Sequence, residues 1–249
     1  MIVIKSQAEI QKIGSAGRIV AEILEGLKKN IVAGMTTADV EAHVDGEIQK
    51  REAVAAFKGY RGYPSSICIS LNAEVVHGIP SRSVKIRNGD LVSIDLGILL
   101  NGFYGDAAIT IPVGNASEEA AKLTAVAEQS LYAGIQQAIV GNRVSDISAA
   151  IQKHVESHGF NVVRAFVGHG IGRQLHEEPQ VPNFGRPGQG ARLKEGMTLA
   201  IEPMVNAGTP DIVILHDGWT AVSADGSLSA HFEHTVAVTK NGPLVLTKL

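Results

Sequence analysis

One stretch constrains the fold of this chain more than any other. It consists of an apolar run over residues 91–100, the dipeptide Asn101-Gly102, and a second β-rich run over residues 103–113. Two β-rich segments on either side of Asn-Gly are the strongest local signal for a hairpin with a two-residue turn. The sequence therefore predicts a long antiparallel hairpin that turns at 101 and 102.

The register of this hairpin brings two carboxylates together. Leu100 is expected to pair with Phe103, and counting back places Gly97 opposite Asp106. Because side chains alternate between the faces of a strand, Asp95 shares a face with Asp106 as its diagonal neighbour. Buried like charges cost several kcal/mol unless a cation or a proton compensates them. Aspartates are more often simply exposed, so the rest of the chain decides whether this pair forms a site.

The length suits one large domain or two small ones, and the composition is that of a compact globular protein. The chain has 249 residues, of which 45% are hydrophobic and 19% charged, and its formal net charge of -3 leaves no basic stripe for nucleic acid. The single cysteine, Cys68, excludes an intrachain disulfide framework and favours a reducing cytoplasm. No signal-peptide layout is present, and no apolar run approaches the roughly 18 residues of a membrane span. We therefore expect a cytoplasmic protein without a membrane or nucleic-acid partner.

Helix signals occur in two pairs, and strands follow each pair. The first helix begins with a capping box from Ser6 to Glu9 and carries apolar residues at helical spacing as far as Leu27. The other elements expected are a helix capped by Thr36 or Thr37, a strand at 66–71, a helix from 117 to about 140, and a helix at 144–158. The remainder is rich in strands and turns, so the predicted class is α+β.

The chain also aligns with itself at an offset of 107 positions. Residues 34–40 then fall on 141–147, and residues 89–95 fall on 196–202. Because two separated blocks match at the same offset, a chance similarity is disfavoured. A solenoid is also disfavoured, since it would need more than two copies of the repeat. We expect one domain over 1–249, with pseudo-two-fold halves of about 1–113 and 117–249 whose acids meet at a shared centre.

Three further residues join the two aspartates as candidate metal ligands. Glu202 and Glu233 lie beside apolar runs, where an isolated carboxylate is costly, and His169 lies among glycines that permit close backbone approach. With Asp95 and Asp106 they form a hard, oxygen-rich donor set able to bridge two divalent ions roughly 3.5–4 Å apart. No cysteine cluster offers a thiolate zinc site.

At these positions the sequence resembles the type I methionine aminopeptidases. The resemblance covers essentially the whole chain and rests on Asp95-x10-Asp106, Gly168-His-Gly-Ile-Gly-Arg-x-Leu-His176-Glu, Ile201-Glu-Pro203 and Phe232-Glu-His-Thr235. It implies the family's pita-bread fold, an α+β architecture with internal pseudo-two-fold symmetry and a central curved antiparallel sheet flanked by helices. It also implies an enzyme that removes the N-terminal methionine of nascent proteins.

The same resemblance implies a role for each ligand. Asp95 and Asp106 bind one ion and Asp106 reaches the second, His169 and Glu202 bind the second ion, and Glu233 bridges both. Two divalent ions are expected, and Co, Mn, Fe and Zn all accept such a donor set. A metal-bridging water or hydroxide is expected to attack the peptide bond, with Glu202 as general base.

Two histidines outside the ligand set are implied to contact the substrate. His176 is expected to polarise the scissile carbonyl, and His77 to lie on the leaving side of the bond. The resemblance points to a methionine pocket of Phe57, Tyr60, Tyr63, Cys68, Leu175 and Trp219. Aromatic edges and a soft sulfur suit a thioether, although such residues more often belong to a core. His231 either supports the ligands from behind or faces outward.

Two alternative functions stay open on the sequence. A proline-specific aminopeptidase of the same fold would carry an additional N-terminal domain, and a non-catalytic binding protein would be expected to lack ligands. The expected substrate is the N-terminal methionine of a nascent polypeptide, and the expected state is a monomer. Any transient ribosome association would have to use the surface of the domain.

Overall fold

The computed structural model describes residues 1–249 as two passes of paired helices followed by strands. The helices are α1 (Gln7–Asn30), α2 (Thr37–Lys50), the short 3-10 helix η1 (Tyr60–Gly62), α3 (Glu118–Ile135) and α4 (Val144–Ser157). The strands are β1 (Val54–Ala55), β2 (Cys68–Leu71), β3 (Glu74–Val76), β4 (Leu91–Leu100), β5 (Phe103–Pro112), β6 (Asn161–Val162), β7 (Gly168–Gly170), β8 (Glu177–Val181), β9 (Thr198–Ile201), β10 (Met204–Asn206), β11 (Ile212–Ile214), β12 (Ala221–Ser223), β13 (Ser229–His231), β14 (His234–Thr239) and β15 (Gly242–Val245). The α+β class is confirmed.

Local capping chemistry explains where the first helices begin. Ser6 accepts a hydrogen bond from the backbone of Glu9, whose carboxylate accepts from the backbone of Ser6, so the predicted capping box caps α1. Thr36 and Asp39 form the same reciprocal pair at the start of α2. The expected strand at 66–71 is shorter in the structure, where β2 spans Cys68–Leu71.

The predicted end of the third helix is wrong, because α3 stops at Ile135 rather than near 140. After Ile135 the backbone changes to tighter turns, in which Ala138 N donates to the carbonyl of Ile135. The chain then pairs with a later segment of the same half, since Gly141 N donates to the carbonyl of Leu193 at 3.0 Å. This tertiary contact ends the helix where the local pattern alone would continue it.

The central hairpin has the predicted register. Leu100 pairs with Phe103 and Gly97 with Asp106 across β4 and β5. Asn101 and Gly102 both have positive φ, at 50° and 77°, as a type I′ turn requires. The two aspartates of the hairpin are therefore diagonal neighbours on one face of the sheet.

The two largest sheets meet along β5 and β14. One sheet has the order β1-β4-β2, with β5 paired to β4, and the other has the order β15-β14-β9-β7-β8. Glu233 N donates to the carbonyl of Ala108 at 2.9 Å, directly before β14. The hydroxyl of Thr235 accepts from Asp106 N at 3.0 Å and donates to the Asp106 carbonyl at 2.8 Å. This junction brings a carboxylate from each half, Asp106 and Glu233, to one place.

Matching contacts in the two halves show the internal symmetry. The isolated bridge between Thr36 and Lys85 has its counterpart 107 residues later between Arg143 and Arg192. At the same offset, Gly34 N donates to the carbonyl of Ile86, as Gly141 does to that of Leu193. Gly34 and Gly141 both have φ of +100°, which glycine adopts without strain.

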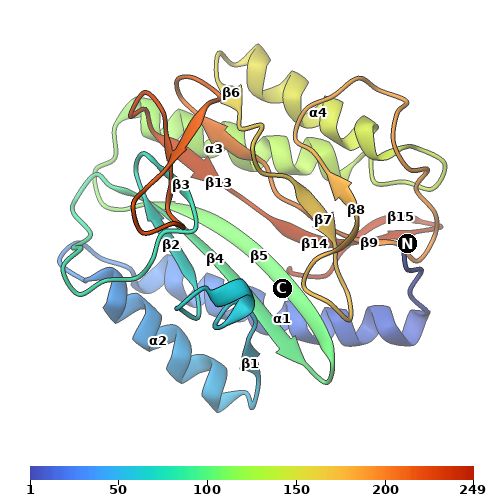
Figure 1. Cartoon of the computed structure of the whole chain (residues 1–249), viewed down its shortest axis with the longest axis horizontal. Coiled ribbons are helices and arrows are strands. Elements are labelled where there is room, and N and C mark those ends of the chain that lie inside the picture. The colour runs from blue at the N-terminus through green and yellow to red at the C-terminus, as the bar shows by residue number, and fades with distance from the viewer.

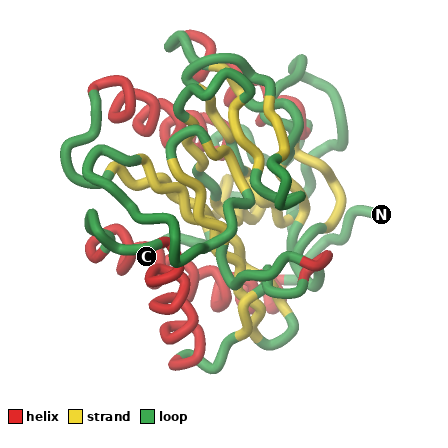
Figure 2. The backbone as a smooth tube through the Cα atoms, turned by 60° about the vertical axis from the view of Figure 1, so that its left-hand side comes forward, coloured by secondary structure: helices red, strands yellow, loops and turns green.

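Each half has its own apolar core. The first packs α1 and α2 against β4 and β5, and the second packs α3 and α4 against β9 and β14. Figure 1 shows α1 and α2 along one edge of the molecule, α3 and α4 along the opposite edge, and the sheets between them. In Figure 2 the helices again form two groups with the strands between. No helix in the structure combines the length and the hydropathy that a membrane-spanning segment requires.

Gly105 permits the close approach of α1 to β5, and its replacement is expected to destabilise the protein. A Cβ at this position would lie 2.5 Å from the backbone nitrogen of Gly17 in α1. We expect Gly105→Ala to lower the free energy of unfolding by about 1–3 kcal/mol, measured by urea denaturation. The matched control is Gly46→Ala in α2, which meets nothing within 4 Å. It should leave stability unchanged or increase it, because alanine favours a helix; an equal loss in both variants would contradict this explanation.

Candidate functional site

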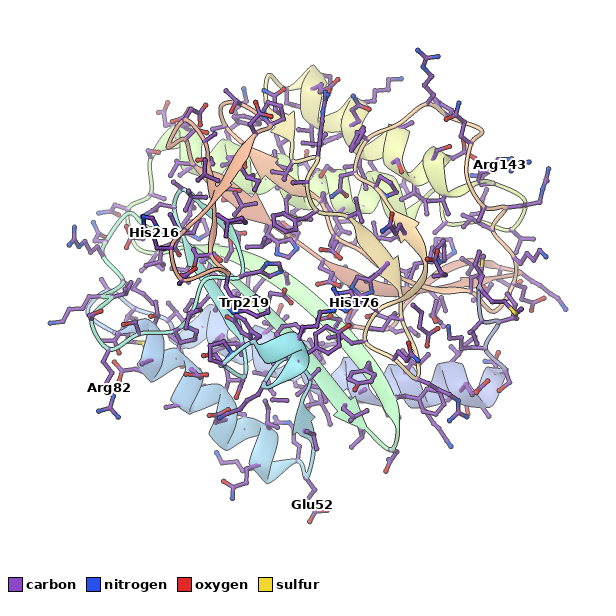
Figure 3. All side chains as sticks on the ribbon, viewed as in Figure 1. Glu52, Arg82, Arg143, His176, His216 and Trp219 are labelled. Atoms are coloured by element: carbon purple, nitrogen blue, oxygen red, sulfur yellow. The ribbon has the colours of Figure 1, made fainter.

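The predicted site residues line one cavity of about 160 Å³. Its walls are Asp95, Asp106, His169, Glu202 and Glu233, the histidines His77 and His176, the residues Phe57, Tyr60, Tyr63, Cys68, Leu175 and Trp219, and in addition Arg61. Figure 3 shows His176 and Trp219 near the centre of the molecule, whereas Glu52, Arg82 and Arg143 project at its periphery. Residues from both halves of the chain thus meet in one place.

Buried carboxylates without partners form the floor of the cavity. Asp106 is only 3% exposed and Glu233 only 2% exposed. One oxygen each of Asp95, Asp106 and Glu233 is buried with no hydrogen-bond partner. Buried polar atoms are almost always satisfied in folded proteins, so several orphans in one cluster indicate a missing partner. A cation is the partner that fits acceptor-only groups.

The raised pKa values of the clustered carboxyl groups also indicate a missing cation. Burial raises the pKa of Asp106 to about 7. Burial also raises the pKa values of Asp95, Glu202 and Glu233, and the neighbouring charge of Asp106 raises them further. Without a cation these carboxyl groups hold their protons to higher pH than ordinary carboxyl groups do, and a divalent ion would favour their charged forms.

His169 is oriented as a ligand. Its Nδ1 donates to the carbonyl of Gly170 at 2.9 Å, which leaves the lone pair of Nε2 free. That Nε2 lies 3.5 Å from Oε1 of Glu202. Ligand atoms of Asp106, His169 and Glu233 all lie within 4.8 Å of one another. Burial lowers the pKa of His169 to about 4, so the ring is neutral at physiological pH, as a metal ligand must be.

His176 is held by Tyr60. Its Nδ1 lies 2.9 Å from the Tyr60 hydroxyl, and the two rings stack with centroids 5.2 Å apart. The centroid of the His169 ring also lies 4.1 Å from that of His176. Burial, and after it the neighbouring His169, lowers the pKa of His176 to about 3, which keeps the ring neutral. If the Tyr60 hydroxyl donates to Nδ1, the proton of His176 resides on Nε2.

His77 lies in a different wall, between aromatic rings. Its ring meets that of Phe166 edge-on at 5.2 Å and that of Trp219 at 6.4 Å. Its φ is +62°, a left-handed conformation that costs a non-glycine residue energy and is concentrated at functional sites. Burial lowers the pKa of His77, so it too is neutral at physiological pH.

The remaining wall is apolar and firmly packed. Phe57, Tyr63, Cys68, Ile171 and Leu175 form a buried cluster, against which Tyr60 and Trp219 pack. The Tyr63 hydroxyl lies 2.9 Å from the carbonyl of Gly78, to which it can donate. Phe57 approaches β4 at Gly97, where a Cβ would lie 2.7 Å from the Phe57 ring. The six residues expected in a methionine pocket therefore share one cavity with the carboxylate cluster.

The sequence predicted no role for Arg61 and left the orientation of His231 open. Arg61 lines the cavity, and the only signal for it was its position between Gly59 and Gly62. His231 does not face outward: it is 2% exposed, and its Nε2 lies 3.9 Å from Oε2 of Glu202. Its backbone is tied to β5, since His231 N donates to the hydroxyl of Thr110 at 2.8 Å. His231 therefore supports the cluster from behind.

Comparisons with known proteins agree with this geometry. The profile of metallopeptidase family M24 matches residues 11–240. The methionine aminopeptidase of Clostridium acetobutylicum is 51% identical over 247 residues, which are 99% of each chain. The crystal structure of methionine aminopeptidase from Thermotoga maritima matches with a TM-score of 0.98 at 49% identity and covers 100% of both chains.

Proline-specific relatives match less completely. The prolidase from Pyrococcus furiosus has a TM-score of 0.79 at 25% identity, and the match covers 99% of this chain but 66% of the prolidase. The prolidase thus contains a further part that has no counterpart here. The comparisons support the methionine enzymes over the proline-specific alternative.

Proposed function

Because this chain belongs to metallopeptidase family M24 and is a member of its methionine aminopeptidases, we propose that its cavity takes up the N-terminal methionine of a polypeptide and hydrolyses the bond that follows. One observation carries this proposal. The buried carboxylate–histidine cluster and the apolar wall of aromatic rings and a sulfur share a single cavity. A substrate side chain held by that wall has its backbone beside the cluster.

The donor set fits divalent metal ions. The orphaned oxygens of Asp95, Asp106 and Glu233 and the free Nε2 of His169 are the groups that would hold them, together with Glu202. We propose two ions per chain, since five donors exceed the usual protein share of a single catalytic ion. Co, Mn, Fe and Zn all accept this set. Bound ions would supply Lewis-acid polarisation of the carbonyl and lower the pKa of a nucleophilic water.

Glu202 is the proposed general base. It lies directly after β9, with its side chain 14% exposed and bordering the cavity. Its two oxygens lie 3.5 Å from Nε2 of His169 and 3.9 Å from Nε2 of His231, so the carboxylate borders both rings. From there it takes a proton from the attacking water and returns it to the leaving amine.

The two neutral histidines are proposed to act on the peptide bond as hydrogen-bond donors. With Nδ1 of His176 engaged by Tyr60, its Nε2–H is available to the scissile carbonyl oxygen, where negative charge develops. His77, held between Phe166 and Trp219, lies across the cavity and contacts the leaving side of the bond. Both rings donate without adding charge, because their pKa values are lowered.

The apolar wall is proposed to select methionine. Aromatic edges and a soft sulfur make favourable contacts with a thioether, and Tyr63, Trp219 and Cys68 supply both. The Tyr63 and Trp219 rings meet edge-on at 5.2 Å, which fixes the shape of this wall.

The setting of the reaction is also a proposal. The protein acts as a monomer on the amino termini of nascent polypeptides, and contact with ribosomes uses the surface of the domain. The free thiol of Cys68 fits a reducing cytoplasm.

A peptide assay with metal present tests the function. We expect release of free methionine from Met-Ala-Ala-Ala-amide, no release from the Nα-acetylated peptide, and no cleavage of Ala-Pro-Ala-amide. An enzyme that cleaved only before proline, or cleaved the acetylated peptide equally well, would contradict the proposal.

Loss of the Tyr60 hydroxyl should lower turnover through His176. We expect Tyr60→Phe to lower kcat about three- to tenfold, since one hydrogen bond is lost, with KM and metal content unchanged. Tyr104→Phe is the matched control, because Tyr104 packs beside the same apolar cluster and its hydroxyl makes no hydrogen bond within the protein. An equal fall in kcat in both variants, or a loss of metal in the Tyr60 variant, would assign Tyr60 a merely structural role.

A further inference from the structure

A second hollow of about 690 Å³ opens beside the catalytic cavity. It is lined by the chain from Val167 to His169, the loop residues Arg173, Gln174 and His176, the β8 residues Glu177, Glu178 and Gln180, and also by Met1, Val3 and Arg61. Arg61, His169 and His176 line both hollows, so the two adjoin at these residues. A polypeptide whose first residue fills the cavity has this groove as a path for the residues that follow.

Two of the charged side chains in the groove, Glu177 and Arg173, already have ion-pair partners in the protein. Glu177 forms a salt bridge with Lys5, and the two side chains are 7% and 2% exposed. Arg173 lies 3.1 Å from a carboxylate oxygen of Glu9 and also stacks over the ring of Phe103. Glu178 is exposed, lines only the outer groove and is absent from the catalytic cavity.

Arg61 differs from these residues, because its guanidinium has no carboxylate partner. It forms no salt bridge, and its one ring contact is with Tyr60, at 5.5 Å from the centroid. Tyr60 is in turn bound to His176, so the cation is anchored next to the proposed reaction centre. The backbone at Arg61 has φ of +50°, between two glycines that also have positive φ. Glycine or asparagine would adopt this conformation with less strain than arginine.

We propose that Arg61 is a specificity-determining residue that binds an acidic side chain at the third position of the substrate. The first residue occupies the cavity and the second holds the scissile amide, so the third is the first to enter the groove, next to Arg61. Arg61 is exposed, forms no salt bridge and lines both hollows, so its guanidinium is available to a carboxylate of the substrate. This inference rests on the proposed aminopeptidase function.

Peptides that differ at one position test it. The probes are Met-Ala-Asp-Ala-amide, Met-Ala-Lys-Ala-amide and Met-Ala-Ala-Ala-amide, whose amidated ends remove the terminal carboxylate. For the wild-type enzyme we expect kcat/KM to be about threefold higher for the Asp than for the Lys peptide, as for an exposed ion pair. The ratio should fall toward one in Arg61→Gln and invert in Arg61→Glu. High salt should reduce it in the wild type.

Arg173→Gln is the matched control, because it removes a guanidinium that Glu9 already neutralises. We expect its Asp-to-Lys ratio to equal that of the wild type. An unchanged ratio in Arg61→Gln, or an equal loss in Arg173→Gln, would overturn the assignment. The neutral peptide distinguishes the role of Arg61 from the aminopeptidase function itself. If the wild-type enzyme cleaves this peptide but shows no Asp-to-Lys preference, only the role of Arg61 is contradicted.

Discussion

Replacement of Glu202 by glutamine is expected to lower kcat about 1,000-fold or more on Met-Ala-Ala-Ala-amide, within the range for a lost general base. The amide has nearly the same shape as the carboxylate but cannot accept the proton of the attacking water. His169 and His231, which border the two carboxylate oxygens, should keep their positions. The substrate is held by the apolar wall, so KM should change by less than about threefold, in keeping with a role confined to the transition state.

The control for this variant is a carboxylate that lies far from the cavity. Glu195 pairs with Lys240 at 3.6 Å on the surface, with half of its side chain exposed, and Glu195→Gln should retain full activity. Metal content is measured by mass spectrometry on both variants. It shows whether activity is lost because the proton acceptor is missing or because the metal ions are no longer bound. A Glu202→Gln enzyme that kept its metal and a kcat within tenfold of the wild type would show that another group accepts the proton.

Removal of metal is expected to abolish the activity and to lower the melting temperature at pH 7.5. Ions bound to the folded state alone stabilise it by mass action, by about 2.7 kcal/mol at one hundred times the dissociation constant. For a protein of this length that corresponds to a shift of about 5–10 °C. Thermal melts with a chelator and with added Mn²⁺ measure the difference, and renewed addition of Mn²⁺ should restore both stability and turnover.

The size of this difference should depend on pH. The folded-state pKa of Asp106 is raised to about 7, and those of Asp95, Glu202 and Glu233 are also raised. In the metal-free protein the folded state therefore holds protons that the unfolded state releases above pH 4, and stability falls as the pH rises from about 4 to 7.

Metal reverses this trend, because it binds the deprotonated carboxylates. The gap between the melting temperatures with metal and with chelator should therefore widen from pH 5 to pH 7.5. A gap that stayed constant, or narrowed with rising pH, would mean that the cluster is not where the ions bind.

Local signals predicted much of this architecture. Asn101-Gly102 determines the register of β4 and β5, because a two-residue type I′ turn leaves only one pairing, and side-chain alternation then brings Asp95 beside Asp106. The capping box at Ser6 acts over three residues and can be read directly from the chain. The offset of 107 residues was visible because both halves need a glycine at the same positive-φ position, Gly34 and Gly141.

Features that depend on contacts between distant residues could not be read in this way. The end of α3 at Ile135 follows from the hydrogen bond between Gly141 and Leu193, and no sequence signal near residue 135 predicts that contact. The inward position of His231 depends on its hydrogen bonds to Thr110, more than a hundred residues away in the chain. The alternation of side chains along β13 does not by itself specify which face of the strand, buried or exposed, carries His231.

Residues close together in the chain specify the hairpin and the helix starts, and the order of the carboxylates and histidines along the chain resembles that of one family. Short-range turns, caps and alternation are sufficient for these, since each is decided within a few residues. Long-range packing brings Asp106 and Glu233 together at the junction of the two halves, and it places Arg61, which forms no salt bridge, among the residues that line both hollows. Burial, and with it the raised pKa values and the need for a cation, arises only when distant segments exclude water together.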